Sequence, residues 1–223
     1  MKYRQLDFKR RSLVLGTTAA LLYAKQAISA GSSLSILVLG DSLSAEYGLA
    51  RGTGWVALLE ARLADHTMQA KVINASISGE TTAGGRTRLV ALLKTHQPTH
   101  VIVELGANDA LRGLSIKSSS EALQAMISSI QRTGAKVVLV GMMVPPNYGR
   151  QYAENFANMF NQLARTNKTA LVPFFLKGIA DRPDARDWFQ ADGIHPLAKG
   201  HPIMLDQVWA ALKPLLLGQQ ARA

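Results

Sequence analysis

The 223-residue chain contains no cysteine. A disulfide scaffold, a cysteine nucleophile, an iron–sulfur cluster and a thiolate zinc site are therefore excluded, and covalent catalysis would have to use Ser, Thr, Lys or a carboxylate. Aromatic residues make up only 6% of the chain and charged residues 18%, whereas hydrophobic residues make up 48%. With 18 Gly and 8 Pro in addition, this composition excludes a disordered or collagen-like chain and predicts one globular domain.

Acidic residues are scarce relative to basic ones, because 15 Asp and Glu stand against 25 Lys and Arg, for a formal net charge of +10. Such an excess can indicate a protein that binds nucleic acid. However, residues 1–30 hold six of the basic residues and only one acidic residue, so half of the net charge lies in this short segment. The other basic residues are mixed with acidic ones and are not interleaved with aromatics, which argues against a nucleic-acid partner.

Residues 1–30 have the layout of an export signal. A basic stretch ends at Arg11, an apolar run covers residues 13–24, and small residues follow at 27–31. Because a membrane-spanning helix needs about 20 apolar residues, this run is too short for a lasting anchor. We therefore expect a cleaved signal, of the Sec or the twin-arginine type, no stable membrane insertion after cleavage, and a mature protein that is periplasmic or secreted.

Residues 31–223 contain no linker, repeat or low-complexity stretch and are expected to form a single domain. Short apolar runs, predicted to be strands, cover residues 34–39, 70–75, 100–105, 136–142 and 170–175. Longer amphipathic stretches, predicted to be helices, cover residues 54–65, 82–95, 119–133, 154–166 and 196–217, with Pro196 at the first position of the last helix. This alternation predicts an α/β fold with a parallel sheet and helices on both faces, whose ligands bind beyond the carboxyl ends of the strands.

Ser42 is a candidate nucleophile because it follows the first predicted strand by three residues, after a Gly–Asp turn that would expose its hydroxyl at the sheet edge. A serine hydroxyl needs a base within hydrogen-bond distance, and the base needs an acid that fixes its tautomer. Asp192 and His195 lie three residues apart in the loop after the fifth predicted strand and fit these two roles. Glu104 also lies at a strand end, but the spacing of Asp192 suits the acid better. The pattern predicts a catalytic triad of Ser42, Asp192 and His195.

Acyl transfer at a serine also needs hydrogen-bond donors for the oxyanion that develops on the substrate. Gly79 follows the second predicted strand, and its backbone N–H can approach a substrate because no side chain is in the way. Asn108 follows the third predicted strand, and its side-chain amide can supply another donor. Together with the N–H of Ser42, these groups are predicted to form an oxyanion hole. Such a reaction requires neither a metal nor an organic cofactor.

Each of these motifs is common on its own, so the prediction depends on their convergence at one edge of the sheet. Two other classes of protein remain open. A flavin or nucleotide binder could use the same type of sheet, but residues 40–44 lack a glycine-rich phosphate loop. A metal enzyme could use His96 and His100, but Pro98 between them breaks the helical spacing, and no carboxylate–histidine motif accompanies them.

The order of these motifs resembles that of the SGNH, or GDSL, hydrolases. The four matching blocks are Gly40-Asp41-Ser42-Leu43, Gly79, Gly106-Ala107-Asn108-Asp109 and Asp192-Gly193-Ile194-His195. Longer matches, at residues 39–45, 74–79, 103–106, 146–150 and 192–196, are similar to bacterial members that act as esterases, arylesterases, thioesterases and lysophospholipases. The resemblance covers nearly all of residues 34–217. It implies a flavodoxin-like three-layer sandwich with five parallel strands in the order 2-1-3-4-5, the same triad and oxyanion hole, a mobile loop around residues 108–113, and a monomer.

The activity implied by the resemblance is that of a serine hydrolase in lipid metabolism. It would cleave small carboxylic esters, and thioesters, of fatty acids through an acyl-enzyme. A carbohydrate-deacetylating esterase of the same superfamily is the alternative, because a triad does not define the acyl group or the leaving group.

A groove for the acyl chain is expected from the loops after the third and fourth predicted strands. Its candidate residues, which could instead serve packing, are Leu111, Met143, Val144 and Pro145. Tyr148 and Arg150 could contact a head group or stabilise their own loop. Two segments depart from the family's pattern, residues 46–54 after the candidate nucleophile and residues 142–144, and either could alter the acyl-group preference.

Overall fold

The sheet of the protein consists of five parallel strands in the order β2-β1-β3-β4-β5. The strand alternation in the sequence predicts the parallel sheet, and the family resemblance implies this order. The structure is a computed structural model that describes residues 34–220, so the predicted export signal lies outside the described residues. The strands are β1 (Leu34–Gly40), β2 (Ala70–Asn74), β3 (His100–Glu104), β4 (Lys136–Val140) and β5 (Ala170–Val172). Each strand begins at the first residue of its predicted run. β2 and β3 end one residue before the predicted end, β4 two and β5 three, whereas β1 extends one residue beyond it.

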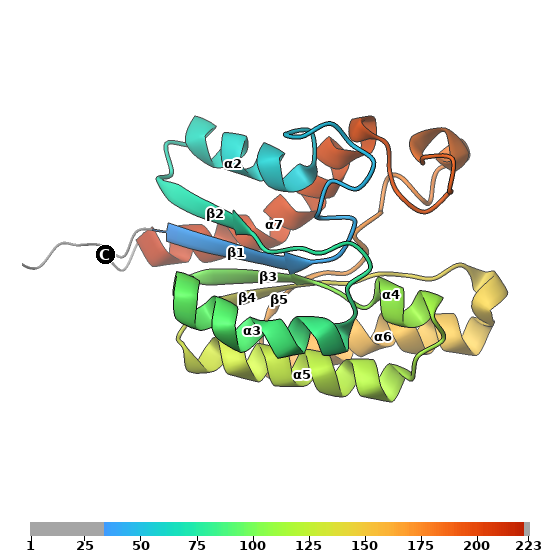
Figure 1. The fold of residues 1–223 in the computed structure, drawn as a ribbon, viewed down its shortest axis with the longest axis horizontal. Helices are drawn as coiled ribbons and strands as arrows, with labels where there is room; N and C mark the ends of the chain where they lie inside the picture. The colour runs from blue at the N-terminus through green and yellow to red at the C-terminus, as the bar shows by residue number, and fades with distance from the viewer. Residues whose placement is uncertain (1–33, 221–223) are drawn as a thin grey trace, which may run out of the picture. The chain divides into compact units, whose positions relative to one another are not determined.

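Helices cover both faces of the sheet, which gives the expected α/β arrangement of three layers (Figure 1). One face carries α2 (Trp55–Asp65) and α7 (His201–Gln220), and the other carries α3 (Thr82–His96), α5 (Ile116–Arg132) and α6 (Arg150–Asn167). The connections contain a short helix, α4 (Ala107–Leu111), and three 3-10 turns, η1 (Pro146–Tyr148), η2 (Ala185–Trp188) and η3 (Ala198–Gly200). Within residues 34–220, no helix has both the length and the hydropathy needed to cross a membrane.

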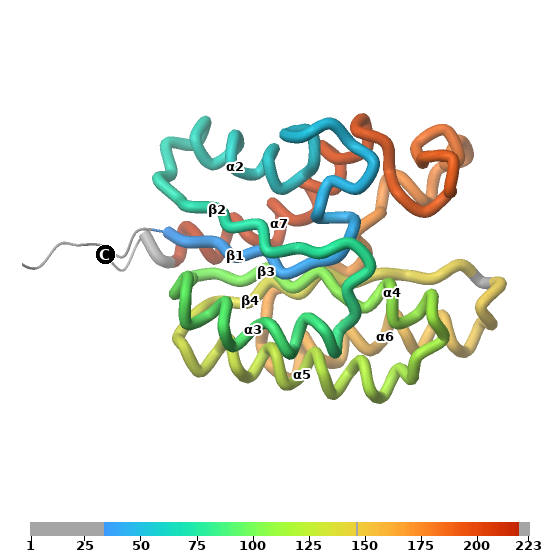
Figure 2. Tube along the Cα trace, in the orientation of Figure 1, coloured from blue at the N-terminus to red at the C-terminus, as the bar shows by residue number. Residues whose placement is uncertain are grey.

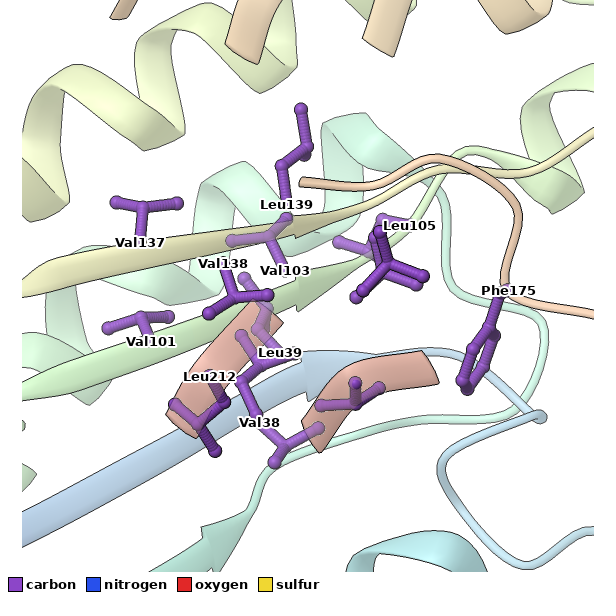
Figure 3. Close-up of a cluster of buried hydrophobic side chains, with 14 of the residues drawn as sticks. Val38, Leu39, Val101, Val103, Leu105, Val137, Val138, Leu139, Phe175 and Leu212 are labelled. Carbon is purple, nitrogen blue, oxygen red and sulfur yellow. The ribbon is translucent and has the colours of Figure 1, made fainter. Parts of the chain in front are cut away.

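The hydrophobic core lies between the central strands and the helices on either side. Because both faces of the sheet are covered, its central strands are apolar almost throughout instead of alternating with polar residues. Figure 3 shows Val101 and Val103 of β3 in one cluster with residues of β1 and β4, and Leu212 of α7 beside them. Burial of each such side chain contributes about 1.5–3 kcal/mol. The core therefore fixes the strands, and with them the position of the sheet edge where the predicted site residues lie.

The parallel register brings the carboxyl ends of the strands to that edge. Gly40, the last residue of β1, is the register partner of Glu104, the last residue of β3. The segments that follow the strands consequently gather at the same end of the sheet (Figure 2). Every predicted site residue lies in one of these segments.

The start of the last helix differs from the sequence prediction, because α7 begins at His201 and not at Pro196. Pro196 instead pairs with Phe189 in an isolated antiparallel bridge. The N–H of Leu197 donates to the carbonyl of Trp188 at 2.8 Å, which extends the pairing by one residue. Pro196 therefore lies in an extended segment that directly follows His195, and the fixed φ of proline is compatible with extended backbone.

The segment at residues 108–113, for which the resemblance implies a mobile loop, begins with the helix α4. The buried carboxylate of Asp109 accepts hydrogen bonds from the N–H of Thr82 (2.9 Å), the hydroxyl of Thr82 (2.5 Å) and the hydroxyl of Ser119 (3.0 Å). These bonds join α4 to the first turns of α3 and α5. The acidic residue of the Asn-Asp pair thus anchors the segment that carries Asn108.

Candidate active site

Ser42 lies in the turn that leaves β1 at the carboxyl edge of the sheet. The Asp41 carboxylate stabilises this turn, because its Oδ1 accepts the N–H of Leu43 at 3.0 Å. The Asp41 carbonyl accepts the N–H groups of Ser44 (3.2 Å) and Ala45 (3.0 Å). Asp41 is buried whereas Ser42 is partly exposed. The Gly–Asp turn therefore presents the Ser42 hydroxyl at the sheet edge.

Asp192 and His195 approach Ser42 from the other end of the sequence. The Nε2 atom of His195 lies 2.8 Å from the Oγ of Ser42, and its Nδ1 lies 2.7 Å from the Oδ2 of Asp192. Both are hydrogen-bond distances. The three residues thus form a continuous chain from carboxylate through imidazole to hydroxyl.

The loop around Asp192 holds its carboxylate in place and favours its ionised form. Oδ1 accepts the N–H groups of Ile194 (2.9 Å) and His195 (3.1 Å). Gly193 has a φ of 69°, in the left-handed region that glycine adopts readily, and this allows the loop to fold back over the carboxylate. The hydrogen bond from Ile194 N–H, together with the hydrogen bonds from His195, lowers the pKa of Asp192 to about 2. Asp192 is therefore ionised at neutral pH and can stabilise an imidazolium.

The loop that carries both residues is a narrow turn joined to the Ser42 segment. The Gln190 N–H donates to the His195 carbonyl at 2.8 Å, and the Gly193 N–H donates to the Gln190 carbonyl at 2.9 Å. The side-chain amide of Gln190 donates to the Tyr47 carbonyl at 2.9 Å, across to the segment that follows β1. The ring of Tyr47 also packs against the imidazole of His195, with centroids 4.4 Å apart. These contacts fix the position of the imidazole relative to Ser42.

The three predicted oxyanion donors line one cavity of about 280 Å³ beside the Ser42 hydroxyl. Within residues 34–220, the N–H groups of Ser42 and Gly79 donate to no carbonyl or side chain, so they are available to a ligand. Gly79 has a φ of 77°, a conformation that favours glycine. The Nδ2 of Asn108 donates one hydrogen to the Oδ2 of Asp41 at 3.0 Å. Because an amide nitrogen carries two hydrogens, the second remains for a ligand.

The cavity is lined by Asp41, Ser42, Leu43, Tyr47, Ser78, Gly79, Ala107, Asn108, Leu111, Ile194 and His195. Of the four residues expected to form an acyl groove, Leu111 lines the cavity and the other three do not. Val144 is buried in the hydrophobic core, whereas Met143 is exposed. The predicted head-group residues Tyr148 and Arg150 are exposed at η1 and at the start of α6.

Tyr47 and Ile194 line the cavity although sequence reasoning did not assign them to it. Ile194 directly precedes His195 in the sequence, and the ring of Tyr47 packs against the His195 imidazole. The exposed fractions of Tyr47 and Ile194, 50% and 45%, are large for hydrophobic residues. The signal available in the sequence is their position: Ile194 lies within the loop that carries Asp192 and His195, and Tyr47 lies in the segment that departs from the family's pattern.

That departing segment is stabilised by Glu46. Its carboxylate accepts the N–H groups of Gly52 (3.0 Å) and Gly54 (2.8 Å). The acidic side chain, placed where the family pattern has small or polar residues, therefore closes a compact turn between β1 and α2. This turn holds Tyr47 beside the cavity.

Two buried carboxyl groups lie beneath the Ser42 turn. Burial raises the pKa of Asp41 to about 6, although hydrogen bonds from Leu43 and Asn108 oppose the shift. Burial and the negative charge of Asp41 raise the pKa of Glu104 well above its ordinary value. A proton shared by this pair is therefore favoured on Glu104, whose side-chain hydrogen bond to Asp41 lowers the pKa of Asp41.

The histidines of the metal alternative lie at the opposite edge of the sheet from Ser42. His96 ends α3, and His100 begins β3, where its Nδ1 lies 2.9 Å from the Thr99 hydroxyl. Among residues 34–220, no group of three or more His, Asp or Glu side chains is arranged to hold a metal ion.

Comparison with known proteins gives a family and close relatives. The model of the GDSL-like lipase/acylhydrolase family matches residues 38–203. Esterase TesA of Pseudomonas aeruginosa is 46% identical over 207 residues, which cover 93% of this chain and 100% of that protein. The thioesterase 1/protease 1/lysophospholipase L1 of Escherichia coli K12 is 39% identical over 187 residues, which cover 84% of this chain and 87% of that protein. A crystal structure of TesA is 48% identical, with a TM-score of 0.78, and covers 81% of this chain and 99% of that one.

Proposed function

Because the chain belongs to the GDSL-like lipase/acylhydrolase family, it is an ester hydrolase, and we propose that Ser42, His195 and Asp192 are its catalytic triad. The observation that carries this proposal is the pair of contacts made by His195, at 2.8 Å to the Ser42 hydroxyl and 2.7 Å to the Asp192 carboxylate. A hydroxyl, an imidazole and a carboxylate in this order are the groups that acyl transfer through a serine requires.

In the first half of the cycle, the Nε2 of His195 accepts the hydroxyl proton as the Oγ of Ser42 attacks the carbonyl carbon of the substrate. Asp192 accepts a hydrogen bond from Nδ1–H and stabilises the imidazolium. The N–H groups of Ser42 and Gly79 and the amide of Asn108 bind the oxyanion of the tetrahedral intermediate. The intermediate collapses when His195 returns the proton to the departing alcohol or thiol, and the acyl group remains on Ser42.

In the second half, His195 removes a proton from water, and the resulting hydroxide attacks the acyl-enzyme carbonyl. The same three donors bind the second oxyanion. The imidazolium of His195 returns this proton to the Oγ of Ser42 as the bond to the acyl group breaks, which releases the carboxylic acid and restores the Ser42 hydroxyl. The chain's own side chains supply every proton transfer in this cycle.

The substrates that we propose are carboxylic esters and thioesters of fatty acids. The names of the relatives, esterase and thioesterase 1/protease 1/lysophospholipase L1, support this class. Leu111 and Ile194 supply apolar surface beside Ser42 for an acyl chain or an apolar leaving group. The alternative of a carbohydrate-deacetylating esterase has less support, because these relatives carry no such name.

Hydrolysis assays with two proteins test this function. Wild type and Ser42→Ala should be compared on nitrophenyl esters of graded chain length, on acyl-coenzyme A and on acetylated xylan. We expect wild type to cleave the first two substrate classes, and Ser42→Ala to lose about 10⁶ in kcat, as for the nucleophile of another serine hydrolase. Turnover of acetylated xylan alone would support the carbohydrate alternative. Unchanged turnover in Ser42→Ala would contradict the triad.

We also infer that the mature protein is a monomer that acts outside the cytoplasm. The support for export is the basic stretch and the apolar run within residues 1–30. Fractionation of cells that express the full chain should find a soluble periplasmic or secreted protein whose N-terminus lies near residue 31. Retention of the intact N-terminus in the cytoplasm would contradict export. Size-exclusion chromatography of the mature protein tests whether it is a monomer in solution.

A further inference from the structure

Glu104 is a buried polar group to which the proposed mechanism assigns no role. Only 2% of its surface is exposed, at the carboxyl end of the central strand β3. Its Oε2 accepts the hydroxyl of Ser44 at 2.7 Å and the N–H of Asp41 at 3.3 Å. The Ser44 hydroxyl in turn accepts the indole N–H of Trp55 at 3.2 Å. Glu104 therefore closes a buried hydrogen-bond network directly beneath the Ser42 turn.

The Glu104 carboxyl adjoins Asp41, because its Oε2 accepts the backbone N–H of Asp41 at 3.3 Å, and a side-chain hydrogen bond between the two carboxyl groups contributes to the pKa of each. Two neighbouring carboxyl groups in a buried site do not both ionise, because neither burial nor the like charge favours a second anion. A hydrogen bond between the two side chains favours the proton on Glu104 and the charge on Asp41. Within residues 34–220, neither group forms an ion pair with Lys or Arg, and the nearby titratable side chain that acts on Asp41 is His195.

Asp41 connects this pair to the oxyanion site. Its Oδ1 accepts the N–H of Leu43 at 3.0 Å, and its Oδ2 accepts the Nδ2 of Asn108 at 3.0 Å. The second contact fixes the plane of the Asn108 amide, because one of its two hydrogens is held by a buried acceptor. The other hydrogen is then oriented by the geometry of the amide itself.

We propose that Glu104 is a positioning residue that donates a hydrogen bond to the Asp41 carboxylate and thereby holds the Asn108 amide in the orientation that binds the oxyanion. The proposal rests on the proposed function, since it assigns Asn108 to the oxyanion site. It accounts for a carboxyl group at a position where every other residue of β3 except His100 is apolar.

A kinetic double-mutant cycle tests this role. Glu104→Met keeps much of the side-chain volume and removes both the donor and the acceptor, so Asp41 loses its partner. We expect a loss of about 10- to 100-fold in kcat, from one misplaced hydrogen bond, with little change in KM. Asn108→Ala removes the donor itself and should cost about 10²- to 10³-fold in kcat. The double variant should turn over no more slowly than Asn108→Ala, because Glu104 acts through Asn108.

Additive losses in the double variant would overturn the proposal, because they would mean that Glu104 supports activity by another route. So would a Glu104→Met protein with wild-type kcat. Glu104→Gln provides the rescue, since its amide can donate to Asp41 while its oxygen accepts from Ser44. It should recover kcat to within about threefold of wild type, a difference well below the loss of one buried hydrogen bond.

Val103→Ala is the matched control for a general loss of packing. Val103 is buried on the same strand and makes no polar contact with the site. Its substitution should lower the unfolding temperature and should leave the effect of Asn108→Ala unchanged in magnitude. If Val103→Ala coupled to Asn108→Ala in kcat as strongly as Glu104→Met does, the buried network around Glu104 would have only a general structural role. Failure of the proposed function itself would appear separately, as full activity in Ser42→Ala.

Discussion

The Nε2 of His195 lies 2.8 Å from the Oγ of Ser42, although 153 residues separate the two in the sequence. The parallel sheet creates this contact, because Ser42 follows β1 and His195 precedes α7, and both segments lie at the carboxyl edge. The turn between Gln190 and His195 then limits where the imidazole can lie. The contact thus depends on the topology of the whole domain and on one short loop.

Replacement of the acid should slow catalysis with little effect on substrate binding. Asp192→Asn keeps the size of the side chain but removes the charge that stabilises an imidazolium. We expect kcat to fall by about 10⁴, the loss seen for the corresponding change in another serine hydrolase, while KM changes little. Steady-state kinetics on a nitrophenyl ester measure both constants. A loss of less than tenfold would remove Asp192 from the triad.

The ionisation of Asp192 should not limit activity in mildly acidic solution. Hydrogen bonds from the Ile194 N–H and from His195 lower its pKa to about 2, so the carboxylate keeps its charge down to approximately that pH. Loss of activity between pH 7 and pH 4 should therefore not follow the protonation of Asp192. An NMR titration of the Asp192 side-chain carboxyl tests this and should find a midpoint near pH 2. A midpoint between pH 4 and 7 would contradict the assignment.

Addition of one methyl group at Gly79 should impair the oxyanion site. Gly79 has a φ of 77°, and a Cβ there would meet no atom closer than 3.5 Å, so the cost to stability comes from backbone strain. We expect Gly79→Ala to lower the free energy of unfolding by about 1–2 kcal/mol and to lower kcat as the backbone N–H shifts. Denaturant unfolding and steady-state kinetics measure the two effects.

Gly134→Ala is the matched control for that experiment. Gly134 has a φ of 84° and open space around its Cα, but it lies between α5 and β4, at the edge of the sheet opposite the site. The control should lose similar stability and keep its kcat. If both variants lost kcat equally, strain alone would explain the result and Gly79 would not belong to the oxyanion hole.

Mild acid should destabilise the fold through His201. Its Nδ1 accepts the N–H of Trp55 at 3.1 Å, and burial lowers the pKa of this side chain below 6.5. As the pH falls below about 6.5, the His201 side chain therefore binds a proton in the unfolded chain before it does so in the folded chain. The stability that neutral His201 provides is present above that pH and is lost as the pH falls from about 6.5 to the lower folded value.

The comparison of wild type with His201→Gln isolates this contribution. His100, whose pKa burial also lowers, acts in the same direction, and Asp41, with a pKa raised to about 6, acts in the opposite one. Both remain in the variant, so they cancel in the difference. We expect the difference in free energy of unfolding between the two proteins to shrink from pH 7.5 to pH 5. A constant difference would show that His201 does not titrate between the folded and unfolded states in this range.

The sheet could be predicted from the sequence because buried parallel strands are apolar along their whole length. β1 and β3 show this pattern, and each strand begins where the apolar run begins. Ser42, Asp192 and His195 could be selected because each follows a strand or precedes the last helix, and parallel strands bring those positions together. Their catalytic roles remain predictions.

The walls of the cavity could not be predicted in the same way. A position after a strand does not reveal which way a side chain points, so Val144 was expected in a groove but is buried in the core. Tyr47 lines the cavity because Glu46 closes a turn through two backbone amides, a contact that no local pattern reveals. Pro196 was expected to begin a helix, but its pairing with Phe189 depends on a tertiary contact.

Labelling by a fluorophosphonate, followed by mass spectrometry of the digested protein, tests most directly whether Ser42 is the activated nucleophile. We predict a single adduct on the peptide that contains Ser42, no adduct in Ser42→Ala, and strongly slowed labelling in His195→Ala. An adduct on a different residue, or labelling of Ser42→Ala at the wild-type rate, would contradict the proposed triad.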